Sequence, residues 1–196
     1  MTTTQVRETN TNNKYHLHMG IAEQGKMYAL SGDHKMALLY YKNAMHLTVQ
    51  AKDPEIFFRH YLEVALESME ILEYFDEVLA YTDKAIAMYD NNPPKDEIAR
   101  IDLAHIYQKK GIALMKKAEV TAAKTALKQG IDLMKKEGHS LPLANTLYRW
   151  LASGFHLDPK RIIAEQNRNK YFSVRPETVD PKRAIKLPDE QLMPGV

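Results

Sequence analysis

The most informative part of the sequence spans residues 25–44 and reads GKMYALSGDHKMALLYYKNA. Apolar residues recur in it at spacings of three and four, which is the period of an amphipathic helix. Ser31 and Gly32 interrupt that period, and Asp33 is a residue type that often caps the start of a helix. The stretch therefore predicts two helices joined by a tight turn.

The same kind of punctuation continues along the chain. Asp53 followed by Pro54 is typical of a helix start, and the run from Asn91 to Pro94 stops a helix because proline cannot continue one. Segments of alternating Val, Ile and Thr, and the usual hairpin turn signals, are missing from the sequence. The predicted fold class is all-α, with helices at about 14–30, 33–51, 54–72, 75–89, 95–116, 119–136, 141–153 and 159–170.

Small and large residues also alternate in a repeated order. The first copy consists of Gly25, Tyr28, Gly32, Ala37, Tyr41 and Ala44. A second, weaker copy consists of Leu62, Ala65, Met69, Phe75, Val78, Tyr81 and Ala85, and a third consists of Tyr107, Gly111, Leu114, Ala123, Leu127 and Gly130. Small residues let paired helices approach closely, and the large residues fill the space between them.

This order of residues resembles the tetratricopeptide repeat family. The copies, aligned on Ala44, Ala85 and Gly130, are 41 (85 − 44) and 45 (130 − 85) residues apart, longer than the usual period of about 34. Leu66 also stands where that family has a small residue. The resemblance implies a right-handed α-solenoid of about three helix pairs, followed by a capping helix over 141–153.

Four prolines divide the sequence after Tyr171 into pieces too short for helices. We therefore expect a disordered N-terminus over 1–13, a helical repeat domain over 14–170 and an extended or disordered tail over 171–196. The tail from Val174 to Val196 keeps several apolar residues, so it is interpreted as a binding element outside the folded domain.

Composition excludes several kinds of protein. The chain of 196 residues contains no cysteine, so disulfides and thiolate metal sites are excluded, and its net charge is only +2. The N-terminal residues do not form a signal peptide, and no apolar run reaches the roughly 20 residues of a membrane helix. We expect a cytoplasmic protein that does not act on membranes.

Charge is nevertheless unevenly distributed. Residues 53–90 hold ten Asp or Glu against two Lys or Arg, whereas residues 95–136 hold ten Lys or Arg against five Asp or Glu. The two regions are either ordinary solvated faces or two electrostatic patches that orient a partner. The acidic region argues against nucleic acid as the partner, because it would repel phosphate.

Motifs that carry chemistry are missing. The sequence has no nucleophile elbow, phosphate-binding loop or paired carboxylates with a nucleophile, so we predict no catalytic residue and no enzymatic activity. Eight histidines occur without the spacing of a metal site, and Gly20 and Gly25 lie in a helical pattern and not after a strand. We expect no metal and no cofactor.

A partner-binding groove is the remaining candidate site. In the tetratricopeptide family the first helix of each pair lines a concave surface. The resemblance maps that surface onto Met19, Lys26, His60, Glu63, Glu67, Glu70, His105, Gln108, Lys109, Ile112 and Lys116. Glu63, Glu67 and Glu70 follow a helical spacing that predicts one acidic stripe, which is either an ordinary wet helix face or a binding surface.

These observations predict a protein–protein interaction module that acts as an adaptor or assembly chaperone. Its groove would bind a peptide or helix of a partner protein that carries basic and apolar side chains. The alternative is a structural subunit of a larger assembly, with the C-terminal tail docked on a neighbouring subunit. A peptide-sensing regulator is a third interpretation, which the short segment before the repeats makes less favourable.

Overall fold

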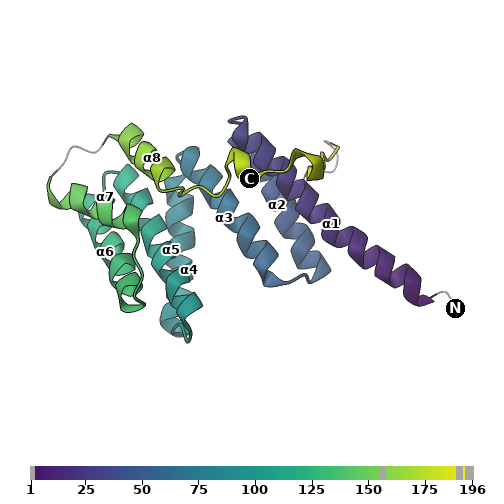
Figure 1. The fold of residues 1–196 in the computed structure, drawn as a ribbon, viewed down its shortest axis with the longest axis horizontal. Coiled ribbons are helices and arrows are strands. Elements are labelled where there is room, and N and C mark those ends of the chain that lie inside the picture. The colour runs from purple at the N-terminus through teal and green to yellow at the C-terminus, as the bar shows by residue number, and fades with distance from the viewer. Residues whose placement is uncertain (1–2, 155–157, 189–191, 193–196) are drawn as a thin grey trace. The chain divides into compact units, whose positions relative to one another are not determined.

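The computed structural model describes residues 3–154, 158–188 and 192, with side chains in those ranges from residue 17 onward. Figure 1 shows that the regular elements of this part of the chain are all helical, which confirms the all-α class. The helices are α1 (Thr3–Leu30), α2 (His34–Ala51), α3 (Glu55–Ile71), α4 (Phe75–Asn91), α5 (Glu97–Lys116), α6 (Val120–Lys136), α7 (Pro142–Ala152) and α8 (Pro159–Arg168), followed by the 3-10 turns η1 (Pro176–Thr178) and η2 (Pro181–Arg183).

Helix α1 is longer than predicted. It begins at Thr3 and not near residue 14, so the expectation of disorder over 1–13 is not met by residues 3–13. That segment contains neither glycine nor proline, and nothing in it interrupts a helix that has started.

Capping explains several of the helix boundaries. The Asp33 carboxylate accepts a hydrogen bond from the Met36 amide at 3.1 Å, directly after Gly32, whose φ of +86° ends the preceding helix. The predicted cap at Asp53 is wrong. Pro54 occupies the N-cap position of α3, and the Asp53 side chain lies instead 3.3 Å from the ring of His18.

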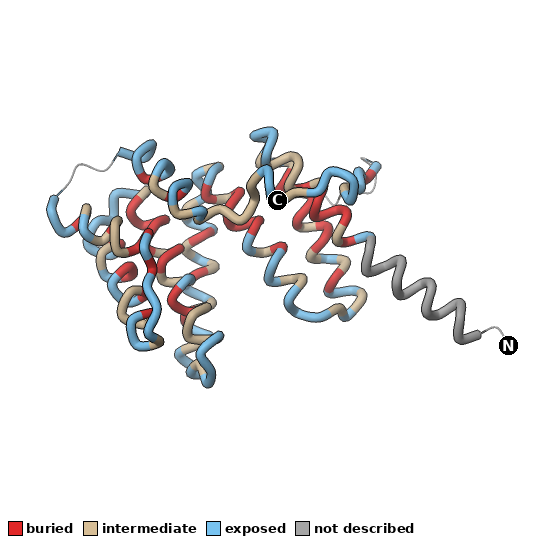
Figure 2. The backbone as a smooth tube through the Cα atoms, in the orientation of Figure 1, coloured by how far each residue is buried: buried red, intermediate tan, exposed pale blue. Residues whose placement is uncertain are grey.

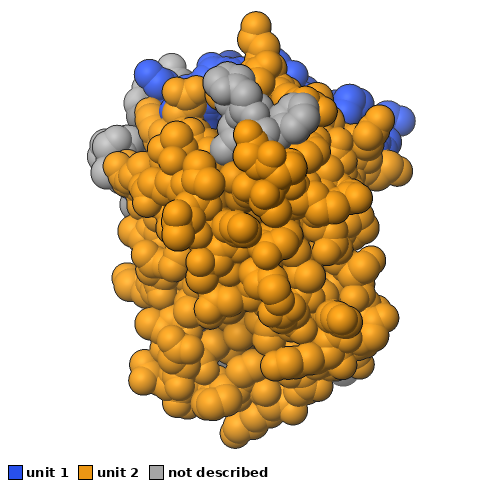
Figure 3. Space-filling model, turned by 90° about the vertical axis from the view of Figure 1, so that its left-hand side faces the viewer, with its two compact units in different colours: residues 1–72, 172–196 blue, residues 73–171 orange. Residues whose placement is uncertain are grey.

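The chain divides into two compact units, which Figure 3 shows in different colours. Unit 1 combines Met1–Leu72 with Phe172–Val196, and unit 2 is Glu73–Tyr171. The expected single repeat domain over 14–170 with a separate tail is therefore replaced by two units, and the tail belongs to the first. The two helices of the predicted second repeat, α3 and α4, fall in different units. This repeat is the one with Leu66 where close helix pairing favours a small residue.

Unit 1 is built around α2, which packs against both α1 and α3. Gly25 of α1 lies against Tyr41 of α2, a small and a large residue of the predicted first repeat. A Cβ atom on Gly25 would lie 2.7 Å from the Tyr41 ring, so only glycine allows α1 to approach α2 this closely. Figure 2 shows the buried residues of these helices on the sides that meet.

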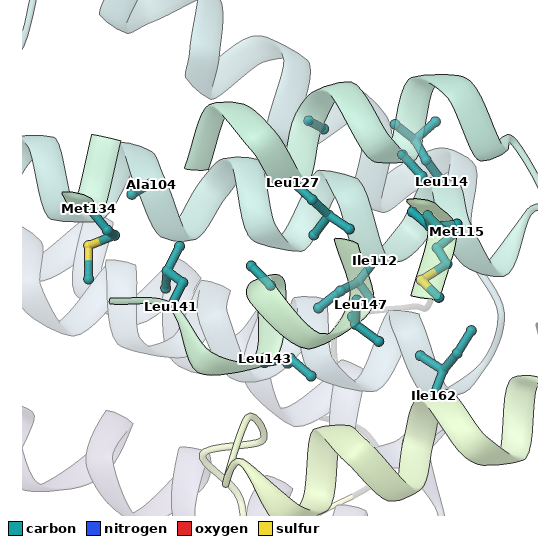
Figure 4. Close-up of a cluster of buried hydrophobic side chains, with 14 residues drawn as sticks. Ala104, Ile112, Leu114, Met115, Leu127, Met134, Leu141, Leu143, Leu147 and Ile162 are labelled. Carbon is teal, nitrogen blue, oxygen red and sulfur yellow. The ribbon is translucent and has the colours of Figure 1, made fainter. Parts of the chain in front are cut away.

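Unit 2 is built around α5, which packs against α4 and α6, while α7 packs against α6 and α8. A small and a large residue of the predicted third repeat also meet, since a Cβ atom on Gly111 would lie 2.6 Å from the Leu127 side chain. Figure 4 shows the core of this unit, in which Ile112 lies beside Leu147 of α7. The packing of successive helices within each unit is typical of helical repeats.

Ion pairs within unit 2 account for part of the uneven charge. Lys110 of α5 lies 2.6 Å from Asp83 of α4, and Lys117 lies 2.5 Å from Asp76. The acidic α4 and the basic α5 therefore neutralise each other across their contact. This arrangement favours the interpretation of these charges as structural over that of two separate partner-orienting patches.

Candidate protein-binding face

The C-terminal segment, residues 172–188, lies in extended form against unit 1. Pro176 and Pro181 each open a short 3-10 turn, and no α-helix forms between 172 and 188. The prediction of an extended segment is therefore confirmed for these residues. The expectation that it stands outside the folded domain is wrong, because it packs against α1 and hydrogen-bonds to side chains of α1, α2 and α3. Residues 189–191 and 193–196 of the predicted tail lie outside the described residues.

Glu67 of α3 holds the start of the segment. This residue is only 4% exposed, and its carboxylate accepts hydrogen bonds from the Ser173 amide at 2.7 Å, the Ser173 hydroxyl at 2.5 Å and the Val174 amide at 3.3 Å. Hydrogen bonds to an ionised acceptor are roughly twice as strong as neutral ones. The Val174 side chain also packs against a buried cluster that includes Tyr41 and Val64.

Glu23 of α1 holds the middle of the segment in the same way. Its side chain is 10% exposed, accepts a hydrogen bond from the Asp180 amide at 2.5 Å and pairs with Lys26 at 3.1 Å. Two buried carboxylates on two helices thus bind backbone amides of one extended segment. Backbone amides are common to almost every residue type, so this mode of binding places little demand on the side chains of the bound segment.

Tyr41 lies close to both carboxylates. Burial raises the pKa of its hydroxyl well above the usual range, and the negative charges of Glu67 and Glu23 raise it further. The hydroxyl therefore stays protonated in the folded protein. Within the described residues its oxygen has no hydrogen-bond partner.

Gly20 of α1 and Tyr40 of α2 hold the end of the segment. The Ile185 amide donates to the Gly20 carbonyl at 2.9 Å. The Leu187 amide donates to the Tyr40 hydroxyl at 3.1 Å, and that hydroxyl faces the Leu187 carbonyl at 3.5 Å. The Leu187 side chain is 9% exposed and belongs to a buried cluster with Ile21, Ala22, Tyr40, Ala44 and Tyr61. We call the surface formed by Gly20, Glu23, Tyr40 and Glu67 the segment-binding face.

The predicted groove residues of unit 1 are only partly gathered on this face. Met19 and Lys26 are half-buried on α1, and Glu67 contacts the segment directly. The predicted acidic stripe is not one wet surface, because Glu63 and His60 are exposed whereas Glu67 and Glu70 are buried. Helix α2 packs against α3 and the bound segment contacts Glu67, so part of the predicted stripe is covered.

The predicted groove residues of unit 2 are mostly covered. His105 is exposed and Lys116 is half-buried, but Gln108 and Lys109 are buried and Ile112 is fully enclosed. Ile112 lies in the core with side chains of α7 and α8, so it does not line an open surface. The Lys109 ammonium lies 5.1 Å from the centre of the Tyr171 ring, a cation–π contact within unit 2.

Sequence reasoning missed Gly20, Glu23 and Tyr40. Glycine inside a helix lowers helix stability by about 1 kcal/mol relative to alanine, so Gly20 carried a signal of close backbone approach. Glu23 carried a weaker signal of burial. It follows Ile21 and Ala22 directly, on a helix that must bury an apolar side.

Other kinds of site are not found in the part of the chain that is described. No three His, Asp or Glu side chains there lie close enough together to hold a metal ion. None of the described helices is both long and apolar enough to cross a membrane. Comparison of the chain with protein-family models, with curated proteins and with solved structures finds no match.

Proposed function

We propose that this protein is a non-enzymatic protein–protein interaction module, an adaptor or assembly chaperone, and that it binds an extended segment of a partner on the segment-binding face. The observation that carries the proposal is the binding of residues 172–188 through backbone amides to the buried carboxylates Glu67 and Glu23. A surface that holds one extended polypeptide in this way is chemically suited to hold another.

The electrostatics of the face support this function. Hydrogen-bond donors stabilise buried carboxylates, so Glu67 and Glu23 favour a segment that brings backbone amides to them. Enzymatic activity has no support here, because the polar groups on the face bind backbone and are not arranged as a nucleophile with a base.

The alternative role, a structural subunit whose tail docks on a neighbour, has less support. Residues 172–188 are bound within their own chain, so docking elsewhere would first require their release. We therefore favour the segment-binding face as the surface that meets the partner.

The proposal is tested with two baits, the full chain and a chain that ends at Tyr171, after circular dichroism has shown that both are helical. Proteins retained from a cell extract are identified by mass spectrometry and then purified. We expect the purified partner to bind the shortened chain more tightly than the full chain, because the face is uncovered. Glu67→Gln in the shortened chain should weaken this binding.

A matched control is Glu63→Gln, one turn earlier on α3 in an exposed position. It should leave partner affinity unchanged. Equal affinity of the partner for the full chain, the shortened chain and the Glu67→Gln variant would place the binding surface elsewhere and contradict the proposal.

A further inference from the structure

The end of the bound segment carries its most deeply buried side chain among the described residues, that of Leu187. We infer that the segment-binding face recognises an aliphatic–x–leucine sequence in a partner's extended segment, and that Ile185, Lys186 and Leu187 are the chain's own copy of it. This inference rests on the proposed function and adds the chemistry of the partner.

Gly20 provides the site for the aliphatic residue. A Cβ atom built on Gly20 would lie 2.4 Å from Cδ1 of Ile185, 2.5 Å from its Cγ1 and 2.9 Å from the Arg183 carbonyl oxygen. A side chain at position 20 would displace both the Ile185 side chain and the Arg183 backbone carbonyl, so glycine here lets the segment lie directly on α1. The same residue accepts the Ile185 amide through its carbonyl, which fixes the backbone of the segment at that point.

Tyr40 and the core provide the site for leucine. The Tyr40 hydroxyl contacts both the amide and the carbonyl of Leu187, so the segment is fixed in register two residues after Ile185. The Leu187 side chain then enters the buried cluster that includes Ile21 and Tyr61. Of the three residues, this one is the most deeply buried, and Ile185 keeps 36% of its surface exposed.

The middle position is unrestricted. Lys186 is exposed, as is Pro188 after the leucine. Alternating inward and outward side chains are expected for an extended backbone, since successive side chains point to opposite sides. The sequence that the face selects is therefore an aliphatic residue, any residue and leucine, in a segment with free backbone amides.

The chain's own copy competes with a partner. A tethered segment binds its own face in an intramolecular step, so a partner's segment must bind more tightly or over a greater length to replace it. The face is thus occupied until such a partner arrives.

The test uses the full chain with Ile185→Ala and Leu187→Ala, which removes the two anchors without altering the face. The probe is a fluorescent peptide of residues 180–188, and its binding is followed by fluorescence anisotropy. We expect the peptide to bind this double variant at least about tenfold more tightly than the wild-type chain, whose own segment competes.

Adding Gly20→Ala to the double variant should weaken peptide binding by about tenfold or more, because overpacking at a close contact is unfavourable. Alanine stabilises a helix more than glycine does, so weaker peptide binding would not result from unfolding of α1. Circular dichroism of the variant verifies that its helices are intact. A control peptide with alanine at positions 185 and 187 should not bind. Failure of the original peptide to bind the double variant, or binding that Gly20→Ala does not change, would overturn the inference.

A second peptide, residues 172–180, separates this inference from the proposed function. If the partner and this peptide bind in a Glu67-dependent manner while the 180–188 peptide does not bind, the function stands and the aliphatic–x–leucine site is wrong. If the 180–188 peptide binds as expected but partner affinity is unchanged by Glu67→Gln and by removal of the segment, the aliphatic–x–leucine site stands and the proposed function is wrong.

Discussion

At the scale of single residues, His18 links α1 to the start of α3. The ring is 1% exposed, its Nδ1 lies 2.6 Å from the Tyr61 hydroxyl and its Nε2 lies 3.3 Å from an Asp53 oxygen. The contact with Asp53 is a close approach of groups and not a well-aligned hydrogen bond. Burial lowers the pKa of His18 below its usual 6.5, and the Asp53 charge opposes this only in part.

This environment predicts a loss of stability in acid. The folded state binds a proton at His18 less readily than the unfolded state does, so stability is fully present above about pH 6.5 and decreases as the pH falls below it. His34 acts in the same direction, since burial also lowers its pKa. The melting temperature should therefore decrease between pH 7.5 and pH 5, and the decrease should be smaller for His18→Gln.

The control is His46→Gln, at an exposed position of α2. It should reproduce the pH dependence of the wild-type chain. An unaltered pH dependence in His18→Gln would show that the buried ring does not contribute to it.

Two neighbouring tyrosines give a second prediction at this scale. Tyr40→Phe removes the hydroxyl that contacts Leu187 and should lower the free energy of unfolding by about 1 kcal/mol. Tyr41→Phe removes a buried hydroxyl without a partner among the described residues, so it should be neutral or stabilising by about 1–3 kcal/mol. Urea denaturation of both variants checks the difference. Equal losses in the two variants would contradict it.

At the scale of helices, close pairing through small residues dominates both units. Ala44 of α2 is fully buried beside Ile21, Tyr40 and Tyr61. Ala44→Trp should therefore destabilise the protein by about 1–3 kcal/mol or more, because the core has no room for the larger side chain. Thermal and urea denaturation measure the effect.

Val49→Trp is the matched control, since it introduces the same side chain on the same helix where the residue is 63% exposed. It should change stability little. Similar melting temperatures for the two tryptophan variants would show that Ala44 does not lie at a helix contact.

Helices and their contacts could be predicted from the sequence because their signals are local. The period of apolar residues indicated the helices, and the small-to-large pattern indicated residues at which paired helices meet. The structure pairs Gly25 with Tyr41 and Gly111 with Leu127. Asp53 shows the limit of such signals. Its position before Pro54 is typical of a cap, but a contact with a residue 35 positions earlier (53 − 18) determines where its side chain lies.

At the scale of the whole molecule, the segment-binding face could not be predicted. The bound segment has no periodic pattern, and it is held at Glu67 and Glu23 through backbone amides, which every non-proline residue carries. Burial of Glu67 and Ile112 likewise depends on elements distant in the sequence, the C-terminal segment for Glu67 and helices α7 and α8 for Ile112. Of the groove residues mapped from repeat positions, Glu67 contacts the chain's own extended segment, whereas Ile112 lies in the core of unit 2.

Removal of the C-terminal segment should destabilise unit 1. A chain ending at Tyr171 loses the burial of Leu187, worth about 1.5–3 kcal/mol, and the hydrogen bonds to Glu67 and Glu23. Each kcal/mol corresponds to about 4–8 °C for a unit of this size. We expect a decrease of several degrees in the transition followed by circular dichroism.

Trp150, the single tryptophan, lies in unit 2 and reports on that unit alone. In the shortened chain, the fluorescence of Trp150 should change at a higher temperature than the circular dichroism signal of the helices. A helical transition at the same temperature in the full and shortened chains would contradict the observed packing of residues 172–188.

The discontinuity of unit 1 has a consequence for synthesis on the ribosome. The chain leaves this unit after Leu72 and returns at Phe172, so 99 residues (171 − 72) are made in between. At about 5–20 residues per second this takes roughly 5–20 s. During that interval α1, α2 and α3 already exist, and the carboxylates of Glu23 and Glu67 have no C-terminal segment to bind. A nascent chain therefore has its segment-binding face open, and a partner present at the moment of translation meets no competitor.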